Sequence, residues 1–240
     1  MKTLIQAIAV LPFLGVAALA AGLSLGAAVW SYSALSPQLQ SLGEPWRYPA
    51  IGILLVLCYG AYGFTLIVVA PLLNFILRAR LKPWRGSAVS LGCVPWYLHA
   101  CLTLVVRLSF LEFVTPSPFT VLFYRLMGMR IGKDVTINTT AIADPSLITL
   151  GDRVTIGGSA SIMAHYAQGG FIVIAPVVIG AGATIGLRAI VLGDVTIGEK
   201  AKVLAGSFVL PGTVIPAGET WGGIPAAPVD LKKFRESVSC

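Results

Sequence analysis

Charged residues are scarce in this chain. They make up 11% of its 240 residues, against 56% hydrophobic residues and a mean hydropathy of +0.86. None occurs between Lys2 and Glu44. A composition this apolar excludes an ordinary soluble protein. The net charge of +7 comes mostly from Lys and Arg that flank apolar stretches, so we expect no nucleic-acid partner.

Histidine and cysteine are scarce as well. The chain has two histidines and four cysteines, namely His99, His165, Cys58, Cys93, Cys101 and Cys240. The cysteine spacing shows no disulfide framework, and a cytoplasmic domain would keep its thiols reduced. Cys93, His99 and Cys101 lie close in sequence, but their apolar neighbours favour core or interfacial packing over metal binding. We therefore expect no metal site.

Two long uncharged runs dominate the N-terminal third. Leu4–Trp30 and Ala50–Leu77 are each long enough, at about 1.5 Å per residue, to cross a hydrocarbon core roughly 30 Å thick. A first run of this length, followed by a second, does not fit a cleaved signal peptide. The second run is followed by the positive charges Arg78, Arg80, Lys82 and Arg85. By the positive-inside rule, residues 1–85 form a transmembrane helical hairpin with both ends in the cytoplasm.

A third uncharged run, residues 86–106, is harder to assign. Pro95 interrupts it, and Arg85 and Arg107 at its two ends give no charge asymmetry that would support a crossing. If it crossed, the rest of the chain would face outward. The aromatic residues of 111–129 are typical of a membrane-surface segment. We therefore expect residues 86–129 to form an interfacial or re-entrant segment.

A six-residue period runs through the C-terminal half. Every sixth residue is aliphatic in the series Val173, Ile179, Ile185, Val191, Ile197, Val203, Val209 and Ile215, and earlier in Ile131, Ile137 and Ala143 and, in shifted register, in Leu150, Ile156 and Ile162. A helix would repeat its apolar face every three to four residues, so the period predicts a parallel β-helix. We assign it to residues 130–228, followed by a tail over 229–240.

The register of this repeat breaks over Met163–Ile172, whose sequence is MAHYAQGGFI. A break in a regular solenoid predicts a loop that leaves the wall, and loops on rigid scaffolds often carry function. This loop contains His165, and imidazole is the side chain best suited to act as a base near neutral pH. The backbone N–H groups of Gly169–Gly170 could stabilise a developing oxyanion.

Three segments of the chain carry a family resemblance. They are FYRLMGMRIGKDV (Phe123–Val135), DPSLITLGDRVTIGGSASIMAH (Asp144–His165) and VVIGAGATIGLRAIVLGDVTIGEKAKVLAGSFVLPGTVIPAGETWGGIPAAP (Val177–Pro228). They resemble the membrane-attached branch of the hexapeptide-repeat acyltransferases, and are most similar to the terminal domain of Pls-type nonribosomal peptide synthetases and to polysaccharide O-acetyltransferases. The resemblance implies a left-handed β-helix, an acyl-CoA donor such as acetyl-CoA, and a homotrimer with its active site in the cleft between subunits.

The resemblance also implies that His165 is the general base. Relatives often carry an acidic residue just after this histidine, whereas here Tyr166-Ala167-Gln168 follows. The imidazole would then have to be oriented by Asp144, if it lies close in space, or by Gln168 or a backbone carbonyl. The candidates for CoA binding are Gly186, Arg188, Lys202, Trp221 and Pro225. Each also has a structural explanation, as a tight or solvated corner of the β-helix or as a cap on its last coil.

The sequence thus predicts a multi-pass protein of the bacterial inner membrane with a cytoplasmic β-helix domain. It would transfer an acyl group to a hydroxyl or amine of a membrane-proximal small molecule, lipid or glycan. The alternative is a non-catalytic trimeric β-helix scaffold at the membrane, favoured by the missing acidic neighbour of His165. The β-helical carbonic anhydrases hold zinc with three histidines, and two histidines cannot build that site in the usual way.

Overall fold

The computed structural model describes residues 2–230, with side chains from residue 11 onward. It divides into two compact units. The first comprises the chain up to Arg78 together with Cys101–Leu111, and the second comprises Ala79–Ala100 together with the chain from Glu112 onward.

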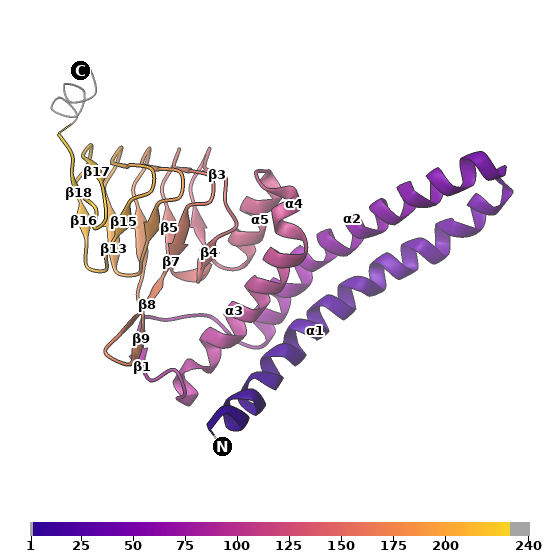
Figure 1. The fold of residues 1–240 in the computed structure, drawn as a ribbon, viewed down its shortest axis with the longest axis horizontal. Helices are drawn as coiled ribbons and strands as arrows, with labels where there is room; N and C mark the ends of the chain where they lie inside the picture. The colour runs from indigo at the N-terminus through magenta and orange to yellow at the C-terminus, as the bar shows by residue number, and fades with distance from the viewer. Residues whose placement is uncertain (1, 231–240) are drawn as a thin grey trace. The chain divides into compact units, whose positions relative to one another are not determined.

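The first unit is built on a helical hairpin. Helices α1 (Lys2–Leu35) and α2 (Glu44–Ile76) run side by side and are joined by the 3-10 turn η1 (Ser36–Ser41) (Figure 1). Gly63 of α2 lies so close to the ring of Phe110 that a Cβ at this position would clash with it. Glycine is therefore what lets the π-helical turn η3 (Arg107–Leu111) pack against α2.

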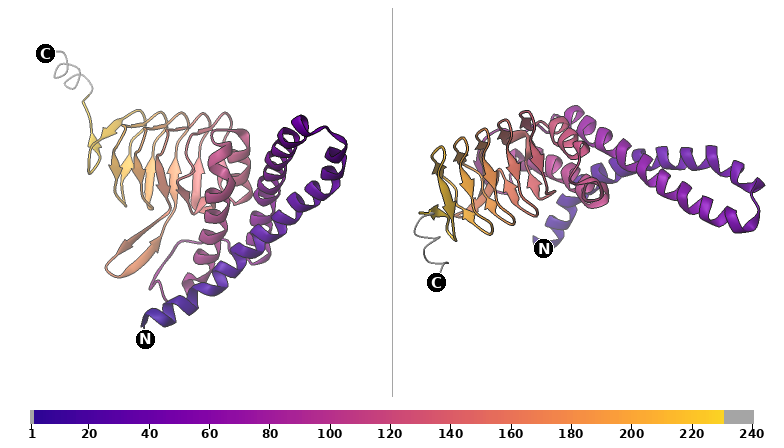
Figure 2. Two further views of the ribbon diagram at one scale, coloured as in Figure 1. Left: turned by 45° about the vertical axis from the view of Figure 1, so that its right-hand side comes forward. Right: turned by 90° about the horizontal axis from the view of Figure 1, so that it is seen from above.

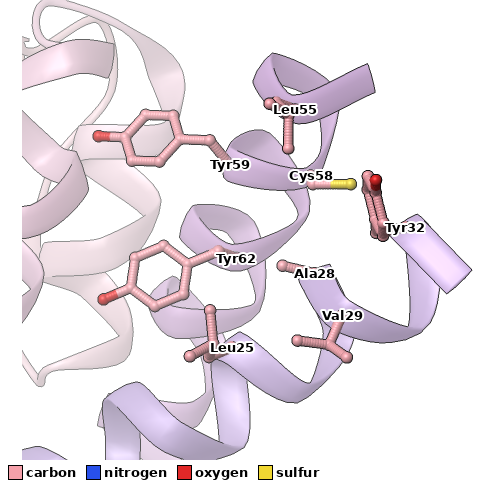
Figure 3. A pocket seen from close by; sticks show the side chains of 8 residues that line it. All are labelled: Leu25, Ala28, Val29, Tyr32, Leu55, Cys58, Tyr59 and Tyr62. Atoms are coloured by element: carbon pink, nitrogen blue, oxygen red, sulfur yellow. The ribbon is translucent and has the colours of Figure 1, made fainter. Parts of the chain in front are cut away.

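A groove of about 480 Å³ lies between α1 and α2 (Figure 3). Its lining is formed by Leu25, Ala28, Val29, Tyr32, Leu55, Cys58, Tyr59 and Tyr62. These side chains include neither a histidine nor a carboxylate, so the groove offers no base of the kind that acyl transfer needs. It belongs to the apolar surface of the hairpin.

The described residues contain three helical segments long and apolar enough to cross a membrane, Leu11–Ser41, Glu44–Ile76 and Leu91–Val114. The third begins with the 3-10 turn η2 (Leu91–Cys93) and continues through α3 (Val94–Val106) and η3 to the short α4 (Glu112–Val114). The sequence predicted the first two as spans and the third as interfacial or re-entrant. By length and composition alone, all three segments could cross a membrane.

The second unit contains a parallel β-helix. Its coils are formed by β2 (Arg130–Ile131), β3 (Thr136–Ile137), β4 (Ile142–Ala143), β5 (Ile148–Leu150), β6 (Thr155–Ile156), β7 (Ser161–Met163), β10 (Val177–Ile179), β11 (Thr184–Ile185), β12 (Ile190–Val191), β13 (Val195–Ile197), β14 (Lys202–Val203), β15 (Phe208–Val209), β16 (Val214–Ile215), β17 (Thr220–Gly222) and β18 (Ala227–Pro228). They form three sheets, in the orders β16-β13-β10-β5-β2, β18-β17-β14-β11-β6-β3 and β15-β12-β7-β4. All pairs are parallel except β17 with β18. The predicted fold, a left-handed β-helix of hexapeptide repeats preceded by apolar helices, is confirmed (Figure 1).

The six-residue period describes the interior of this β-helix with two exceptions. The repeat aliphatics from Ile179 to Ile215 are all buried, and their strands pair in the register that stacks them coil on coil. Val173 does not belong to this series, because it lies in a strand outside the coils. Ala143 was also misplaced: Ile142 is the buried partner of Ile162, since this side of the coil, counted from Ile137, is one residue shorter than the six-residue repeat.

The break in the repeat is a β-hairpin that leaves the wall (Figure 2). Strands β8 (His165–Gln168) and β9 (Phe171–Ile174) pair antiparallel and are joined by Gly169 and Gly170, both in the left-handed region with φ of 57° and 80°. Two successive positive φ values are those of a type I′ turn, which glycine adopts without strain. Strand β1 (Trp84–Gly86) adds antiparallel to the other edge of β9, giving the three-stranded sheet β1-β9-β8.

The β-helix is preceded by the amphipathic helix α5 (Pro118–Leu126). The hydroxyl of Ser117 caps it by accepting from the backbone N–H of Phe119. Phe119, Leu122 and Leu126 are exposed along one side, while Phe123 is buried. This stripe at i, i+3 and i+7 fits the membrane-surface segment expected over 111–129.

The burial pattern of β13 generates a stability prediction. Ile197 is buried and stacked between Ile179 and Ile215, whereas its neighbour Thr196 is exposed. Ile197→Ala should lower the free energy of unfolding by about 2–5 kcal/mol, through lost burial and a residual cavity. The control Thr196→Ala should change it by less than about 0.5 kcal/mol. Equal effects of the two variants in denaturant or thermal melts would contradict the assigned register.

Candidate active site

His165 is placed where the chain leaves the β-helix. It is the first residue of β8, and its side chain is 25% exposed. The coil beneath supports this position closely, because a Cβ on Gly193 would lie 3.1 Å from the backbone nitrogen of His165. A larger residue at this point would press on the backbone at the base of the hairpin. The imidazole therefore lies at the root of the hairpin and not at its turn.

Asp144 lies one coil before His165. It connects β4 to the 3-10 turn η4 (Pro145–Leu147), and its backbone is in the left-handed region with φ of 61°. Aspartate tolerates this conformation better than most residues. Its side chain is 2% exposed. A carboxylate buried to this degree has to be paired or hydrogen-bonded.

The structure brings Asp144 and His165 together. Nδ1 of His165 lies 2.5 Å from Oδ2 of Asp144. With an ionised carboxylate, which is an acceptor only, and a neutral ring, Nδ1 donates in this pair and Nε2 is left as an acceptor. This is the tautomer that a general base needs. The sequence separation of 21 residues explains why no acidic neighbour of His165 is visible in the sequence.

A third side chain, that of Trp96, contacts both Asp144 and His165, and the sequence analysis did not identify it. Trp96 of α3 donates its indole N–H to Oδ1 of Asp144 at 2.9 Å. Its ring lies edge-on to the imidazole of His165, with 5.1 Å between centroids and 73° between planes. Trp96 stands 48 residues before Asp144, in an uncharged run that resembles membrane sequence, so no local pattern indicated this contact.

His99 lies one turn further along α3 and is fully buried. It interacts electrostatically with Asp144 and hydrogen-bonds the backbone of Ala79. For His99 the sequence favoured core or interfacial packing over metal binding. Within residues 2–230, no group of three or more His, Cys, Asp or Glu side chains lies close enough to hold a metal ion.

Gln168 and Gly169–Gly170 lie away from the imidazole of their own chain. Gln168 pairs with Phe171 next to the hairpin turn, three residues from His165, or roughly 10 Å along the strand. The Nδ1 partner is therefore Asp144 and not Gln168. The two glycines form the exposed turn itself, so the oxyanion role expected for them does not follow from this geometry.

A pocket of about 430 Å³ lies between β8 and the wall of the β-helix. It is lined by Tyr166, Ala167, Gln168, Leu192, Asp194, Leu210, Pro211 and Gly212. Tyr166 directly follows His165, and Asp194 directly follows the Gly193 that supports it. The pocket therefore adjoins the root of the hairpin.

The candidates for CoA binding lie on or beside another face of the β-helix. Lys202 is exposed on β14, Trp221 lies on the neighbouring β17, and Arg188 is an exposed corner residue with φ of 56°. A Cβ on Gly186 would collide with the backbone of Ala205 in the next coil, so close packing accounts for this glycine by itself. The indole of Trp221 donates to Glu219 at 2.8 Å, and Pro225 is exposed in the turn before β18. Within one chain, the structure does not bring this set to His165.

The site is thus a histidine paired with a buried carboxylate, at the root of a hairpin that leaves a stack of hexapeptide coils. No protein-family model matches the chain. Among curated proteins it is similar to the δ-poly-L-ornithine synthetase of Acinetobacter baumannii (strain AB307-0294), with 28% identity over 170 residues that make up 70% of this chain and 13% of that protein. It is also similar to the mitochondrial γ carbonic anhydrase 2 of Arabidopsis thaliana, with 39% identity over 93 residues, or 38% of this chain and 29% of that protein. The chain thus spans less than a third of the length of either relative.

Two solved structures with similar folds are both acetyltransferases. The serine acetyltransferase of Neisseria gonorrhoeae is 20% identical, with a TM-score of 0.42 over 72% of this chain and 55% of that chain. A hexapeptide-repeat acetyltransferase of Vibrio cholerae O1 biovar eltor, complexed with acetyl coenzyme A, is 20% identical, with a TM-score of 0.48 over 64% of this chain and 96% of that chain.

The buried pair generates a prediction for Asp144. Asp144→Asn keeps the side-chain volume but removes the charge that holds Nδ1–H, so any base-catalysed turnover should fall by about 10²-fold or more. The matched control is Asp152→Asn, in which an exposed wall carboxylate that accepts from the Lys133 backbone is changed in the same way. Its turnover should stay within about twofold of wild type. Equal turnover of the two variants would show that the Asp144 contact plays no part in the chemistry.

Proposed function

We propose that the protein is an acyltransferase at a membrane surface. It moves an acyl group, with acetyl as the favoured one, from acyl-CoA to a hydroxyl or amine. The observation that carries this proposal is the Asp144–His165 pair at the root of the hairpin. It supplies a neutral imidazole with Nε2 unprotonated, held in one orientation by a buried carboxylate. The sequence resemblance to hexapeptide-repeat acyltransferases supports acyl-CoA as the donor.

In this mechanism, Nε2 of His165 accepts the proton of the acceptor hydroxyl or amine as its oxygen or nitrogen attacks the thioester carbonyl carbon. The resulting tetrahedral adduct collapses, the carbon–sulfur bond breaks and CoA leaves as a thiolate. The imidazolium then returns the proton to the sulfur, which regenerates the neutral ring. Asp144 stabilises the imidazolium during this cycle without accepting a proton itself.

The scaffold alternative loses its main support. It was favoured because no acidic residue follows His165 in the sequence, yet a carboxylate reaches the ring from the preceding coil. A scaffold does not need a buried carboxylate directed at a partly exposed imidazole, and such an arrangement is costly unless it is fully paired.

We propose further that the active form is a homotrimer. The candidate CoA contacts Arg188, Lys202 and Trp221 lie on or beside a face formed by β14 and β17, whereas His165 leaves from the end of β7 in a different sheet. A cleft between two subunits would bring one face of a β-helix next to the hairpin of its neighbour.

The likeness to a carbonic anhydrase does not change the proposed acyl transfer. The β-helical carbonic anhydrases hold zinc with three histidines, whereas this chain has two, and His99 is buried in the second unit.

We also propose that the protein lies in the bacterial inner membrane with its β-helix in the cytoplasm. The apolar segments Leu11–Ser41 and Glu44–Ile76 would span it. The segment Leu91–Val114 fits a re-entrant or interfacial position, because Trp96 and His99 in its first half contact polar groups of the second unit. The remainder, about 15 residues, is roughly 22 Å long and falls short of a core about 30 Å thick.

The proposed acceptor is membrane-proximal, being an amphiphilic small molecule, a lipid or a lipid-linked glycan. Anchoring the site at the bilayer raises the local concentration of such acceptors. The exposed side of α5, with Phe119, Leu122 and Leu126, supports a position at the membrane surface.

His165→Ala tests the activity. In a thiol-release assay with acetyl-CoA and a panel of hydroxyl and amine acceptors, the variant should lose about 10²–10⁴-fold in turnover. Its melting temperature should fall, because the buried Asp144 keeps only the indole donor of Trp96, so turnover is compared well below the melting temperature of the variant. Wild-type turnover in the variant would remove the base assignment.

The topology can be tested by labelling with a membrane-impermeant thiol reagent. In a chain without its native cysteines, Ser159→Cys at an exposed corner of the β-helix should react only after the cells are permeabilised. Gln40→Cys in the exposed turn between α1 and α2 should react in intact cells. Ready labelling at residue 159 in intact cells would mean that Leu91–Val114 crosses the bilayer.

A further inference from the structure

The carboxylate of Asp144 has two oxygens, and each meets a different donor. Oδ2 faces Nδ1 of His165 at 2.5 Å, and Oδ1 accepts from the indole N–H of Trp96 at 2.9 Å. A carboxylate rotates readily about its terminal torsion, which has only broad, two-fold preferences. A single hydrogen bond would leave that rotation open. The second bond, from a donor that comes from another element, closes it.

The chemistry of the indole makes this second bond directional. An indole N–H can donate but cannot accept, and it does not titrate in the physiological range. Oδ1 therefore remains an acceptor, and Oδ2 is the oxygen left to face the imidazole. A tyrosine or serine hydroxyl in the same place could turn and accept instead, so it would impose no such order.

The ring of Trp96 constrains the imidazole as well. It lies edge-on to His165 at a centroid distance of 5.1 Å, in the geometry that aromatic pairs prefer. A half-turn of the imidazole about its Cβ–Cγ bond would exchange the sites of the ring nitrogens and carbons, and it would have to sweep past this edge. Trp96 thus touches both members of the pair, one through its N–H and the other through its ring.

The chain segment that bears Trp96 is itself attached to the hairpin. Strand β1 pairs with β9 so that Ile174 stands in register with Trp84 on one side and with His165 on the other. At the other end of the segment, His99 is fully buried and bonded to the backbone of Ala79. The segment is thus tied to the hairpin through the pairing of β1 with β9, and it contacts the imidazole of His165 through the ring of Trp96.

We infer that Trp96 is a positioning residue, which fixes the rotation of the Asp144 carboxylate and through it the tautomer and orientation of His165. The inference rests on the proposed function for its kinetic consequence, but its structural content is independent of it. It assigns part of the site to α3, within the segment Leu91–Val114 whose composition resembles membrane sequence.

Trp96→Phe tests the inference because it removes the N–H donor and keeps an aromatic ring. Turnover should fall by about 10- to 100-fold, since misplacing a reacting group by about 1 Å has effects of this size. The Michaelis constant for acyl-CoA should stay within about twofold, because an orienting group acts on the chemical step and not on donor binding. The control is Trp46→Phe, in the other unit, where the indole is 72% exposed. It should leave both constants unchanged.

A double-mutant cycle separates positioning from general destabilisation. In the Asp144→Asn background, Trp96→Phe should lower turnover by less than a further twofold, because the group through which Trp96 acts is already disabled. Replacing Trp96 by benzothienylalanine, an isostere with sulfur in place of the N–H, should reproduce the loss without changing side-chain volume. A fully additive loss in the cycle, or wild-type turnover in the isostere variant, would overturn the inference.

A spectroscopic measurement keeps the test independent of activity. The chain has two histidines, so ¹⁵N-edited imidazole spectra are simple, and His165→Ala identifies the signals of His165. The wild type should show a protonated Nδ1 with a strongly downfield proton, and Trp96→Phe should weaken or shift that signal. An unchanged signal would refute the positioning role even if no acceptor had been found. Absence of transfer in the wild type together with the expected spectral change would refute the proposed function alone.

Discussion

The buried carboxylate of Asp144 is the constraint on which the site depends. An ionised group that is 2% exposed loses most of its hydration, and the loss costs several kcal/mol unless hydrogen bonds replace it. The structure replaces it from two sides, with the imidazole of His165 and the indole of Trp96. Removing either donor would leave a buried charge partly unsatisfied. The arrangement of α3, β4 and β8 around this one side chain follows from that requirement.

The β-helix provides the rigid frame for this arrangement. Its strands are only two or three residues long, and its coils are held by backbone hydrogen bonds and by aliphatic side chains stacked in register. At Gly186 the backbone of the next coil approaches too closely for any side chain, and at Gly193 the approach is tight. The hairpin that carries His165 therefore starts from a wall with little freedom to shift. Catalytic groups on such a wall need less reorganisation than groups on a free loop.

The relation between the site and the membrane sequence is closer than the composition of the chain indicates. The segment Leu91–Val114 satisfies the length and hydropathy of a span, yet its first half contains Trp96, which hydrogen-bonds the buried carboxylate of Asp144, and His99, which hydrogen-bonds the backbone of Ala79. Hydropathy averages over side chains and does not register the single N–H of an otherwise apolar indole or the two polar nitrogens of an imidazole. An apolar helix can therefore serve a polar site, provided that its few donors meet the acceptors buried there.

The six-residue repeat was sufficient to predict the fold of the C-terminal half. Burial of one aliphatic side chain in every six is a local requirement of the coil, so the β-helix, its break at Met163–Ile172 and the buried positions from Ile179 to Ile215 could be predicted from the sequence. The long uncharged runs likewise predicted the helical hairpin. The prediction from the sequence was wrong at Val173 and Ala143, because a hairpin and a five-residue step from Ile137 to Ile142 interrupt the count at these points.

The composition of the site was decided only by the tertiary structure. His165 stood out in the sequence because it lies in the break, but its partners stand 21 and 69 residues before it in the chain, and no period links them. Asp144 reaches His165 because consecutive coils stack, and Trp96 reaches both because β1 ties its segment to the hairpin. Gly169 and Gly170, which composition alone marks as donors for an oxyanion, are instead the two residues that close a type I′ turn. Local pattern encodes what each residue buries, whereas the contacts between distant residues depend on how the coils and the preceding helix are placed in space.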